Sequence, residues 1–395
     1  MPWVFGHICS SWRQVALAEH RLWNRIRIVD VEPSYREMLE AVLFRSASAP
    51  LDIYMSVVDS LMPVPDIILP QASRISQLHL GTFGDLASFI SEFSTPGRML
   101  DSLTKATLFS PHLDIPDGGI HIFGDCPLLR KLDVRLNERR PELLLKTLRG
   151  LHVPFSQLTE LVLRENSSPH TILCILRETP NLVLCSIVSF SFDPGEHLAF
   201  DVVLPHLKYL SLRCEELRML AQLLCHITPP SLLQLSAVCP YTEDSPDALS
   251  SAVLGFVNRS SCHLTHIRMA GNLAPAVDRL HRSVVRIEAD SCEFQVDSYL
   301  LSSVVQRIAC RELTLPYLEE INRPLYLDTS IDLTNMVEDF WSNGEGRNVS
   351  KEFRAKRIIA NSSAAWEEEF IHWKEEVGLL FNRLSINGGV EFLPQ

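Results

Sequence analysis

The sequence predicts an α/β solenoid, with parallel strands along a concave face and helices along a convex face. Two observations lead to this fold class: an apolar spacing that recurs through most of the chain, and helix-like segments between its copies. A unit of one strand and one helix cannot bury its apolar sides alone. Neighbouring units are therefore expected to stack and to share one continuous core.

The strands are predicted from the spacing L-x-x-L-x-L. Its clearest copy is LTELVLREN, with Leu158, Leu161 and Leu163, followed by Asn166. If any apolar residue is allowed at these positions, nine copies follow one another at steps of 20 to 32 residues. Their first positions are Ile75, Leu103, Leu129, Leu158, Leu182, Leu207, Leu232, Leu264 and Val284.

A polar residue at a fixed distance from each strand supports a true repeat. Three residues after the last apolar position, four of the nine copies carry Asn or Cys: Asn137, Asn166, Asn272 and Cys292. The strand ends there, so a side chain with donor and acceptor capacity can satisfy backbone groups that have left the ladder.

The segments between the strands follow a helical period. EELRMLAQLLCHITPPS places Leu217, Leu220 and Leu224 on one side of a helix, and Pro229 follows where the helix must stop. The segments PHTILCILRETPN and DSPDALSSAVLGFVN repeat the scheme. This alternation distinguishes the repeat from a plain run of strands.

Residues from about 70 to 310 thus resemble the leucine-rich repeat family, in its irregular form with long repeats, and the solenoid is expected to span 70–330. The resemblance implies a surface that binds an unknown protein on the concave side, with no catalytic group of its own. Side chains at the x positions alternate away from the core. The outward residues expected to contact a partner are His79, Asp133, Val162, Ser211, Arg268 and Glu288. For each one, a merely solvated side chain is the alternative interpretation.

The opening segment, 1–28, predicts an amphipathic helix rich in tryptophan. Ile8, Trp12 and Val15 lie at i, i+4 and i+7, and Trp23 follows a short turn. One interpretation is a hydrophobic cap over the first repeat. Residues 29–69 are expected to be a linker and the N-terminal cap of the solenoid.

The same segment resembles the second half of an F-box, as found in F-box-like proteins of mushroom-forming fungi. The matching residues are Ile8, Cys9, Trp12, Arg13, Ala16, Leu22 and Trp23. The resemblance implies docking onto a Skp-type adaptor of an SCF-type cullin-RING ubiquitin ligase, with the repeats holding the protein to be ubiquitinated. It also implies roles for single residues: Pro2, Val4, Ile8 and Cys9 at the adaptor, and Trp12 and Trp23 in the F-box core. The L-P-x-E helix that opens a complete F-box is not in the sequence, so a repeat scaffold without a ligase role is the alternative.

Past about residue 330 the repeat pattern fades into a polar stretch. The segment 364–385 then predicts an amphipathic helix that caps the solenoid, or, as the alternative, binds a partner. Its apolar residues are Trp366, Phe370, Trp373, Val377, Leu380 and Leu384.

Composition excludes several other classes. The net charge is −12, and clusters such as Arg139 and Arg140 are too short to form a basic stripe, so we expect no nucleic-acid partner. No apolar run reaches the length of a membrane span and no leader precedes the chain, which indicates a cytoplasmic or nuclear protein without a membrane role. The ten cysteines are scattered without a C-x-x-C pair, which predicts reduced, mostly buried thiols.

No known catalytic motif occurs in the chain. The HLTH segment, with His263 and His266, falls on an expected strand, where residues i and i+3 point to opposite faces and cannot share a metal ion. We therefore expect no enzyme activity, no cofactor and no metal site. An enzyme whose residues meet only in the folded chain stays a remote alternative.

Overall fold

The structure is a computed structural model of the 395-residue chain. It describes residues 9–29, 35–57, 64–82, 90–91, 99–110, 115, 119–136, 143–190, 198, 200–214, 216–239, 246–269, 286–289, 320–324, 357–362 and 389–394. The chain has a mixed α/β fold and forms two compact units, Met1–Glu196 (unit 1) and His197–Gln395 (unit 2). The sequence pattern sets no boundary at this point.

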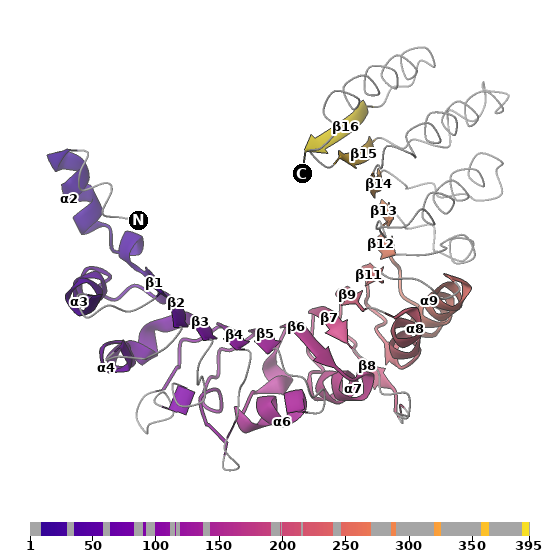
Figure 1. Cartoon of the computed structure of the whole chain (residues 1–395), viewed down its shortest axis with the longest axis horizontal. Helices are drawn as coiled ribbons and strands as arrows, with labels where there is room; N and C mark the ends of the chain where they lie inside the picture. Colours follow the sequence, from indigo (N-terminus) through magenta and orange to yellow (C-terminus); the bar gives the residue numbers. More distant parts are fainter. Residues whose placement is uncertain are drawn as a thin grey trace. The chain divides into compact units, whose positions relative to one another are not determined.

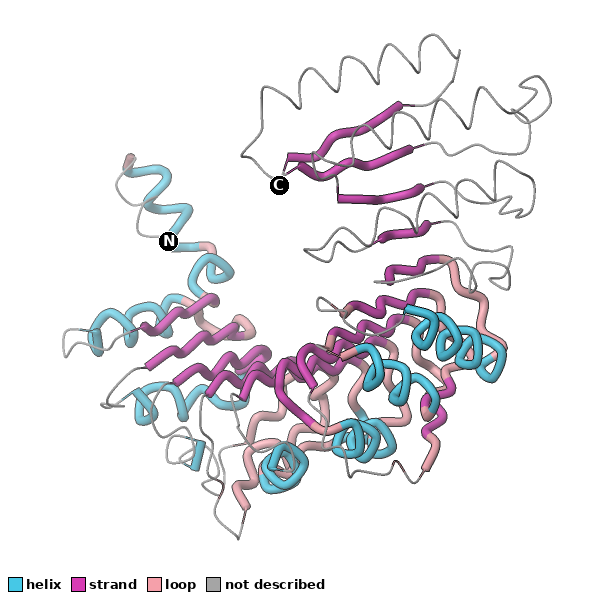
Figure 2. Tube along the Cα trace, turned by 45° about the vertical axis from the view of Figure 1, so that its right-hand side comes forward, coloured by secondary structure: helices cyan, strands magenta, loops and turns pink. Residues whose placement is uncertain are grey.

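Unit 1 contains a parallel sheet whose strands pair in chain order (Figure 2). The strands are β1 (Arg25–Val29), β2 (Leu51–Val57), β3 (Ile75–Thr82), β4 (Lys105–Ser110), β5 (Lys131–Leu136), β6 (Glu160–Ser167) and β7 (Leu184–Phe190). The helices are α2 (Ser10–Ala18), η1 (His20–Trp23), α3 (Tyr35–Arg45), α4 (Val64–Ile68), η2 (Leu69–Arg74), α6 (Leu143–Gly150), η3 (Phe155–Gln157) and α7 (Pro169–Glu178). Figure 1 shows α3, α4, α6 and α7 on one side of this sheet.

The core of unit 1 is built from two rows of side chains that run across the strands. In each strand, two apolar residues at i and i+2 point to the helix side, and the register aligns them with those of the next strand. One row is Ile26, Ile53, Leu78, Ala106, Leu132, Leu161 and Cys185, and the other is Ile28, Met55, Leu80, Leu108, Val134, Leu163 and Ile187. All of them are at most 6% exposed. Burial of each large aliphatic side chain contributes about 1.5–3 kcal/mol.

Hydroxyl groups tie consecutive copies together just before the strands. At the second position of L-x-x-L-x-L, Thr104 Oγ1 donates a hydrogen bond to the carbonyl of Ser76 at 2.9 Å, and Thr159 Oγ1 donates to that of Arg130 at 3.3 Å. The acceptor occupies the same position of the preceding copy in both cases. The same carbonyls accept from the backbone amides of Thr104 and Thr159, each at 2.8 Å, so each hydroxyl adds a further bond between consecutive copies.

The sequence of α7 explains where this helix begins and ends. Ser168 caps it, because its side chain accepts a hydrogen bond from the Thr171 amide at 3.1 Å, and Pro169 occupies the first turn, where its missing N–H has no intrahelical partner. At the other end, Thr179 Oγ1 donates to the carbonyl of Ile175 at 3.0 Å. Together with the buried Ile172, these contacts confirm the helix that the spacing predicts.

Unit 2 repeats the same organisation. Its sheet consists of parallel strands in the order β9 (Tyr209–Arg213), β11 (Gln234–Val238), β12 (His266–Met269), β13 (Arg286–Ala289), β14 (Glu320–Pro324), β15 (Arg357–Ser362) and β16 (Gly389–Pro394). A separate short pair joins β8 (Val202–Val203) to β10 (Ile227–Thr228). The helices α8 (Leu217–Cys225) and α9 (Pro246–Ser260) pack against each other. Thr265 Oγ1 donates to the carbonyl of Leu233 at 3.0 Å, which repeats the hydroxyl contact of unit 1.

The nine strands expected from the apolar spacing are all present, as β3 to β7, β9 and β11 to β13. The strands β1 and β2 extend the sheet of unit 1 into the range expected to be an F-box remnant, a linker and a cap. Likewise β15 and β16 lie in the range expected to hold a polar loop and a helix. Their apolar runs, in RIIANS and GVEFLP, are too short to stand out from the background, which is why sequence reasoning missed them. The predicted helix at 364–385 lies outside the described residues, as do the side chains of Asn137, Asn166, Asn272 and Cys292.

The helix prediction for the opening segment is right, and the prediction about its burial is wrong in part. The helix α2 spans Ser10–Ala18, but Ala16 is its buried residue. Trp12, Val15 and Leu17 are 51%, 59% and 44% exposed. A helical period identifies which residues share a side, but burial also needs a neighbouring element against that side.

Stability should depend strongly on the buried rows. We expect Leu161→Ala to lower the free energy of unfolding by about 2–5 kcal/mol, because Leu161 is 0% exposed and its truncation leaves a cavity between β5, β6 and β7. The matched change Leu128→Ala, at a residue that is 48% exposed, should alter it by less than about 0.5 kcal/mol. Urea unfolding followed by circular dichroism measures both. Equal effects of the two variants would contradict the assignment of the core.

Thiol reactivity should follow burial. Cys9 and Cys225 are exposed, whereas burial raises the pKa of Cys126 and of Cys185 to about 12, and that of Cys262 to about 11. At pH 8 we expect iodoacetamide to modify the first two in the native protein and the other three only after unfolding, as mapped by mass spectrometry. The pKa values of Cys126 and Cys185 are higher in the folded protein than the value of 9.0 in an unfolded chain. Their contribution to the stability of the folded state is therefore fully present below pH 9 and is lost as the pH rises toward 12. Modification of all five at equal rates in the native protein would contradict this.

Candidate functional site

The face of the unit 1 sheet opposite the helices carries three rows of outward side chains. The first row is Arg25, Asp52, Gln77, Lys105, Lys131 and Glu160, and the second is Arg27, Tyr54, His79, Thr107, Asp133 and Val162. The third is Val29, Ser56, Gly81, Phe109 and Arg135, continued by Arg164, which directly follows the last β6 residue paired with β5. We call these three rows the helix-free face. None of these residues is fully buried, so the face is open to a partner.

The charge of this face is opposite to that of the chain. It holds six Lys or Arg residues and three Asp or Glu residues, an excess of three positive charges, whereas the whole chain carries −12. Because parallel strands bring outward residues of successive copies side by side, charges about 25 positions apart in the sequence meet on one surface. This local excess is invisible in the overall composition.

Two arginines converge on one carboxylate at the centre of the face. Arg135 approaches Asp133 with both Nε and Nη2, at 3.5 Å and 3.3 Å from its two oxygens, and Arg164 from the next strand places Nε 3.5 Å from Oδ1. The carboxylate is 18% exposed and the guanidinium side chains are 43% and 45% exposed. We call these three residues the Asp133 cluster. The carboxylate holds both guanidinium groups in place while much of their surface stays accessible.

A second cluster surrounds Asp52 at the β1 end of the sheet. Arg25 Nε lies 3.7 Å from one oxygen of Asp52, and His79 Nε2 lies 3.6 Å from the other. The guanidinium of Arg27 lies over the ring of Tyr54, 5.1 Å from its centroid. These contacts combine charge with aromatic surface, which is a composition that protein interfaces favour.

The imidazole of His79 is held toward its neutral form. Burial lowers its pKa below the usual value of 6.5, and the charge of Lys105 lowers it further, while Asp52 and Asp133 act in the opposite direction. Desolvation is the largest cause, because the side chain is 20% exposed between neighbouring strands. The ring is therefore neutral near pH 7, where its contact with Asp52 is not an ion pair.

The predicted outward residues fall into two aligned sets. In unit 1, His79, Asp133 and Val162 belong to the second row, which also contains Thr107 between them. In unit 2, Ser211 on β9 aligns with Ser236, Arg268 and Glu288 on the following strands. His79, Asp133, Val162, Ser211 and Arg268 are not buried, as expected for outward residues, and the side chain of Glu288 lies outside the described residues.

Several residues of the face were missed. Each missed residue lies on the same side of its strand as an outward residue of the template, two positions away in the sequence, and no chemical motif marks it. These residues are Lys105, Phe109, Arg135 and Arg164. A search for charged residues at i±2 from each expected outward position could have found them.

The predicted adaptor and F-box residues divide into three groups. Pro2, Val4 and Ile8 lie outside the described residues. Cys9 is exposed and directly precedes α2. Trp23 is 2% exposed and its indole Nε1 donates to the carbonyl of Ala16 at 2.6 Å, whereas Trp12 is 51% exposed. Of the two residues expected in the F-box core, the structure therefore buries Trp23 and leaves Trp12 half exposed.

An open hollow lies beside the end of α2. Its volume is about 760 Å³, and its apolar lining includes Leu17, Leu43 and Phe44, the last of which is 86% exposed. Arg45 and Arg74 contribute cationic groups to the same hollow. Arg45 also lies over the ring of Trp23, 4.6 Å from its centroid. The hollow and α2 together form an apolar surface with a few positive charges.

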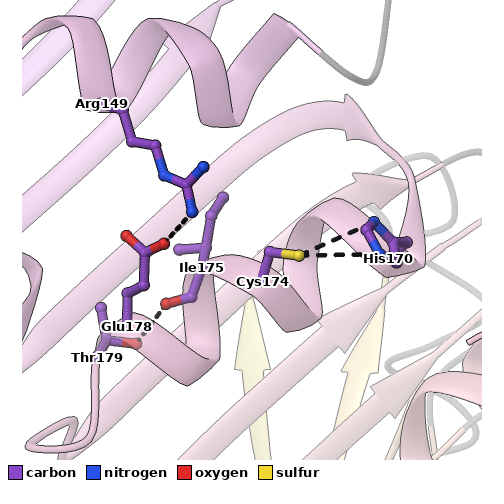
Figure 3. Close-up of polar contacts among 6 residues, drawn as sticks. All are labelled: Arg149, His170, Cys174, Ile175, Glu178 and Thr179. Atoms are coloured by element: carbon purple, nitrogen blue, oxygen red, sulfur yellow. Dashed lines mark hydrogen bonds and ion pairs between the residues drawn. The ribbon is translucent and has the colours of Figure 1, made fainter. Parts of the chain in front are cut away.

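The helix side of unit 1 holds a cysteine and histidine pair on α7 (Figure 3). Cys174 Sγ lies 3.8 Å and 3.9 Å from the two ring nitrogens of His170. Because the sulfur is nearly equidistant from both nitrogens, the contact does not follow the lone pair of either, unlike the contact of an activated thiol with its base. Nearby, Arg149 on α6 bonds Glu178 on α7, and this bond raises the pKa of Arg149. These contacts hold two helices together.

The parts of the chain that the structure describes contain no group of three or more His, Cys, Asp or Glu side chains arranged to hold a metal ion. Within the same parts, no helix combines the length and the apolar character that crossing a bilayer requires. Comparison with protein-family models and with curated proteins finds no match to this chain.

The pKa of His79 tests the electrostatics of the face. We expect His79 to titrate below pH 6.5 and Lys105→Gln to raise its pKa, because the change removes a positive charge that opposes protonation. A chemical-shift titration of the imidazole measures both values, with Lys131→Gln as the control, because Lys131 is paired with Glu160 at 2.6 Å. Since the folded pKa is lowered, the contribution of this group to stability is present above pH 6.5 and is lost as the pH falls. A His79 pKa at or above 6.5 would contradict the assignment.

Proposed function

We propose that the chain is a non-enzymatic protein-recognition module and that it serves as the substrate receptor of an SCF-type cullin-RING ubiquitin ligase. Recognition would use the helix-free face, and docking would use the opening segment. The observation that carries the proposal is the helix-free face itself: rows of exposed and half-buried residues of mixed charge and aromatic character, held on a parallel sheet. Such a surface suits a protein partner better than a small molecule, because small-molecule sites are concave and mainly apolar.

The proposed architecture is a leucine-rich repeat solenoid. Three regularities support it: one strand for each copy of the spacing, helices on one side of the unit 1 sheet, and hydroxyl contacts between equivalent positions of successive copies. In a solenoid each repeat contacts its neighbours, so a series of repeats presents one extended surface for binding.

The docking half of the proposal rests on the resemblance of residues 8–23 to an F-box. The exposed apolar side chains of Trp12, Val15 and Leu17 support it, because three large apolar residues on one short helix are suited to contact a partner. Proteins of this ligase class act in the cytoplasm or the nucleus, and we propose the same location for this chain.

The alternative is a repeat scaffold or binding protein with no ligase role. One observation favours it: Trp23 and Ala16, two positions of the F-box resemblance, are used inside unit 1. Trp23 is buried, bonds Ala16 and lies beneath Arg45. A need to close the end of the sheet would explain both residues without any adaptor.

Capture of an adaptor distinguishes the two functions. The chain is co-expressed with a tagged Skp-type adaptor, and the retained protein is measured. We expect Trp12→Ala to weaken capture roughly thirtyfold, which corresponds to about 2 kcal/mol for an aromatic residue at the centre of an interface. Because Trp12 is 51% exposed, the thermal unfolding of this variant should stay close to that of the native chain.

The matched control is Phe109→Ala, which truncates an exposed aromatic ring on β4, away from α2. It should leave adaptor capture unchanged. If the native chain captures no adaptor, the scaffold function is favoured instead. If Trp12→Ala captures the adaptor as well as the native chain does, docking does not use the exposed side of α2.

A further inference from the structure

The positive charge of the helix-free face is concentrated at two places. One is the Asp133 cluster, where two guanidinium groups share one carboxylate. The other is Lys105, which forms no ion pair with any described residue. By contrast, Lys131 is neutralised by Glu160 at 2.6 Å, and Arg25 lies beside Asp52. Of the three excess positive charges, Arg27 lies at the β1 end over the ring of Tyr54, and the other two lie on β4, β5 and β6.

The Asp133 cluster is prepared to bind an anion. A guanidinium group has five N–H donors, and Asp133 engages at most two from Arg135 and one from Arg164. The remaining donors lie on side chains that are 43% and 45% exposed. Because the shared carboxylate already restrains both arginines, a second carboxylate could bind them with little further loss of side-chain entropy.

The spacing of the two sites matches an extended peptide. Lys105 and Phe109 are four residues apart on β4, and Phe109 is in register with Arg135. Four residues of a strand span about 13 Å, and neighbouring strands are about 4.8 Å apart. A peptide that runs along β4 in an extended conformation would bring residue i to Lys105 and residue i+4 to the Asp133 cluster.

Between these two sites, the face disfavours a charged residue in the peptide. Residue i+2 of such a peptide would face the second row, where Thr107 lies between His79 and Asp133. An acidic side chain there would approach the carboxylate of Asp133, and a basic one would approach Lys105 and the arginines. A small uncharged residue avoids both costs.

From these observations we propose that the helix-free face of unit 1 binds an extended acidic segment of a partner protein, with two carboxylates four residues apart and an uncharged residue between them. This inference rests on the recognition half of the proposed function and is independent of the adaptor. One carboxylate binds Lys105 and the other binds Arg135 and Arg164. The net charge of −12 of the chain keeps other acidic molecules at a distance, so binding depends on this local match.

The test uses the full chain and a fluorescein-labelled peptide of sequence Glu-Ser-Ala-Ser-Glu at low ionic strength, followed by fluorescence polarisation. We expect saturable binding that weakens as salt is added. The same peptide with glutamine in place of both glutamates should bind about tenfold more weakly, or worse. A peptide with the two glutamates adjacent should bind several-fold more weakly, because it cannot reach both sites.

The variants separate recognition from folding. Lys105→Gln breaks no ion pair within the described residues and should weaken binding about tenfold. The double change Arg135→Gln with Arg164→Gln should weaken it further. Arg36→Gln on α3 is the matched control, because it also removes an arginine from a carboxylate pair, with Glu40 at 3.0 Å, and it should leave binding unchanged. Thermal unfolding checks that each variant is folded.

The inference is overturned if the native chain binds the glutamate and glutamine peptides equally, or if Lys105→Gln and the double variant bind as well as Arg36→Gln. Preferential binding of a single-stranded polyuridylate would also overturn it and would assign the face to nucleic acid. If the native chain binds the peptide but does not capture the adaptor, the inference about the acidic segment holds and the docking proposal fails. If the native chain captures the adaptor but does not bind the peptide, the docking proposal holds and the inference about the acidic segment fails.

Discussion

Alignment of apolar residues across parallel strands is the constraint on which the rest of unit 1 depends. Two side chains per strand, such as Leu161 and Leu163 on β6, are buried against their counterparts on the neighbouring strands. A shift of register by one residue would turn both to the opposite side of the sheet. The same register therefore fixes which residues are outward, and it brings Lys105, Asp133 and Arg164 from three different copies onto one face.

The two sides of the unit 1 sheet carry different kinds of polar contact. On the helix side, polar groups are used for structure, as when Thr179 bonds the carbonyl of Ile175 or Arg149 joins α6 to α7. On the helix-free face, ion pairs such as those of Asp133 are partly exposed, and exposed pairs contribute little to stability. Their effect is instead to orient side chains. This difference is why we place recognition on the strands and attribute no function to Cys174 and His170.

Much of the fold and part of the site could be predicted. The alternation of apolar residues located nine strands, and the helical spacing located α7, α8 and α9, because both patterns depend on neighbours close in the sequence. The outward side of His79, Asp133 and Val162 followed from the same alternation. The strands β15 and β16 were missed because their apolar runs are too short to stand out from the background.

For β3 to β6 the sequence by itself determined which residues are buried and which are outward, because a period of two is a local property of the chain. Only the tertiary structure decided that Arg135 and Arg164 share Asp133, since that contact needs the register between strands. It also decided that Trp23 is buried and Trp12 is exposed, although the sequence presents both as large apolar residues. Burial depends on what a fold places opposite a side chain, and a local pattern does not contain that information.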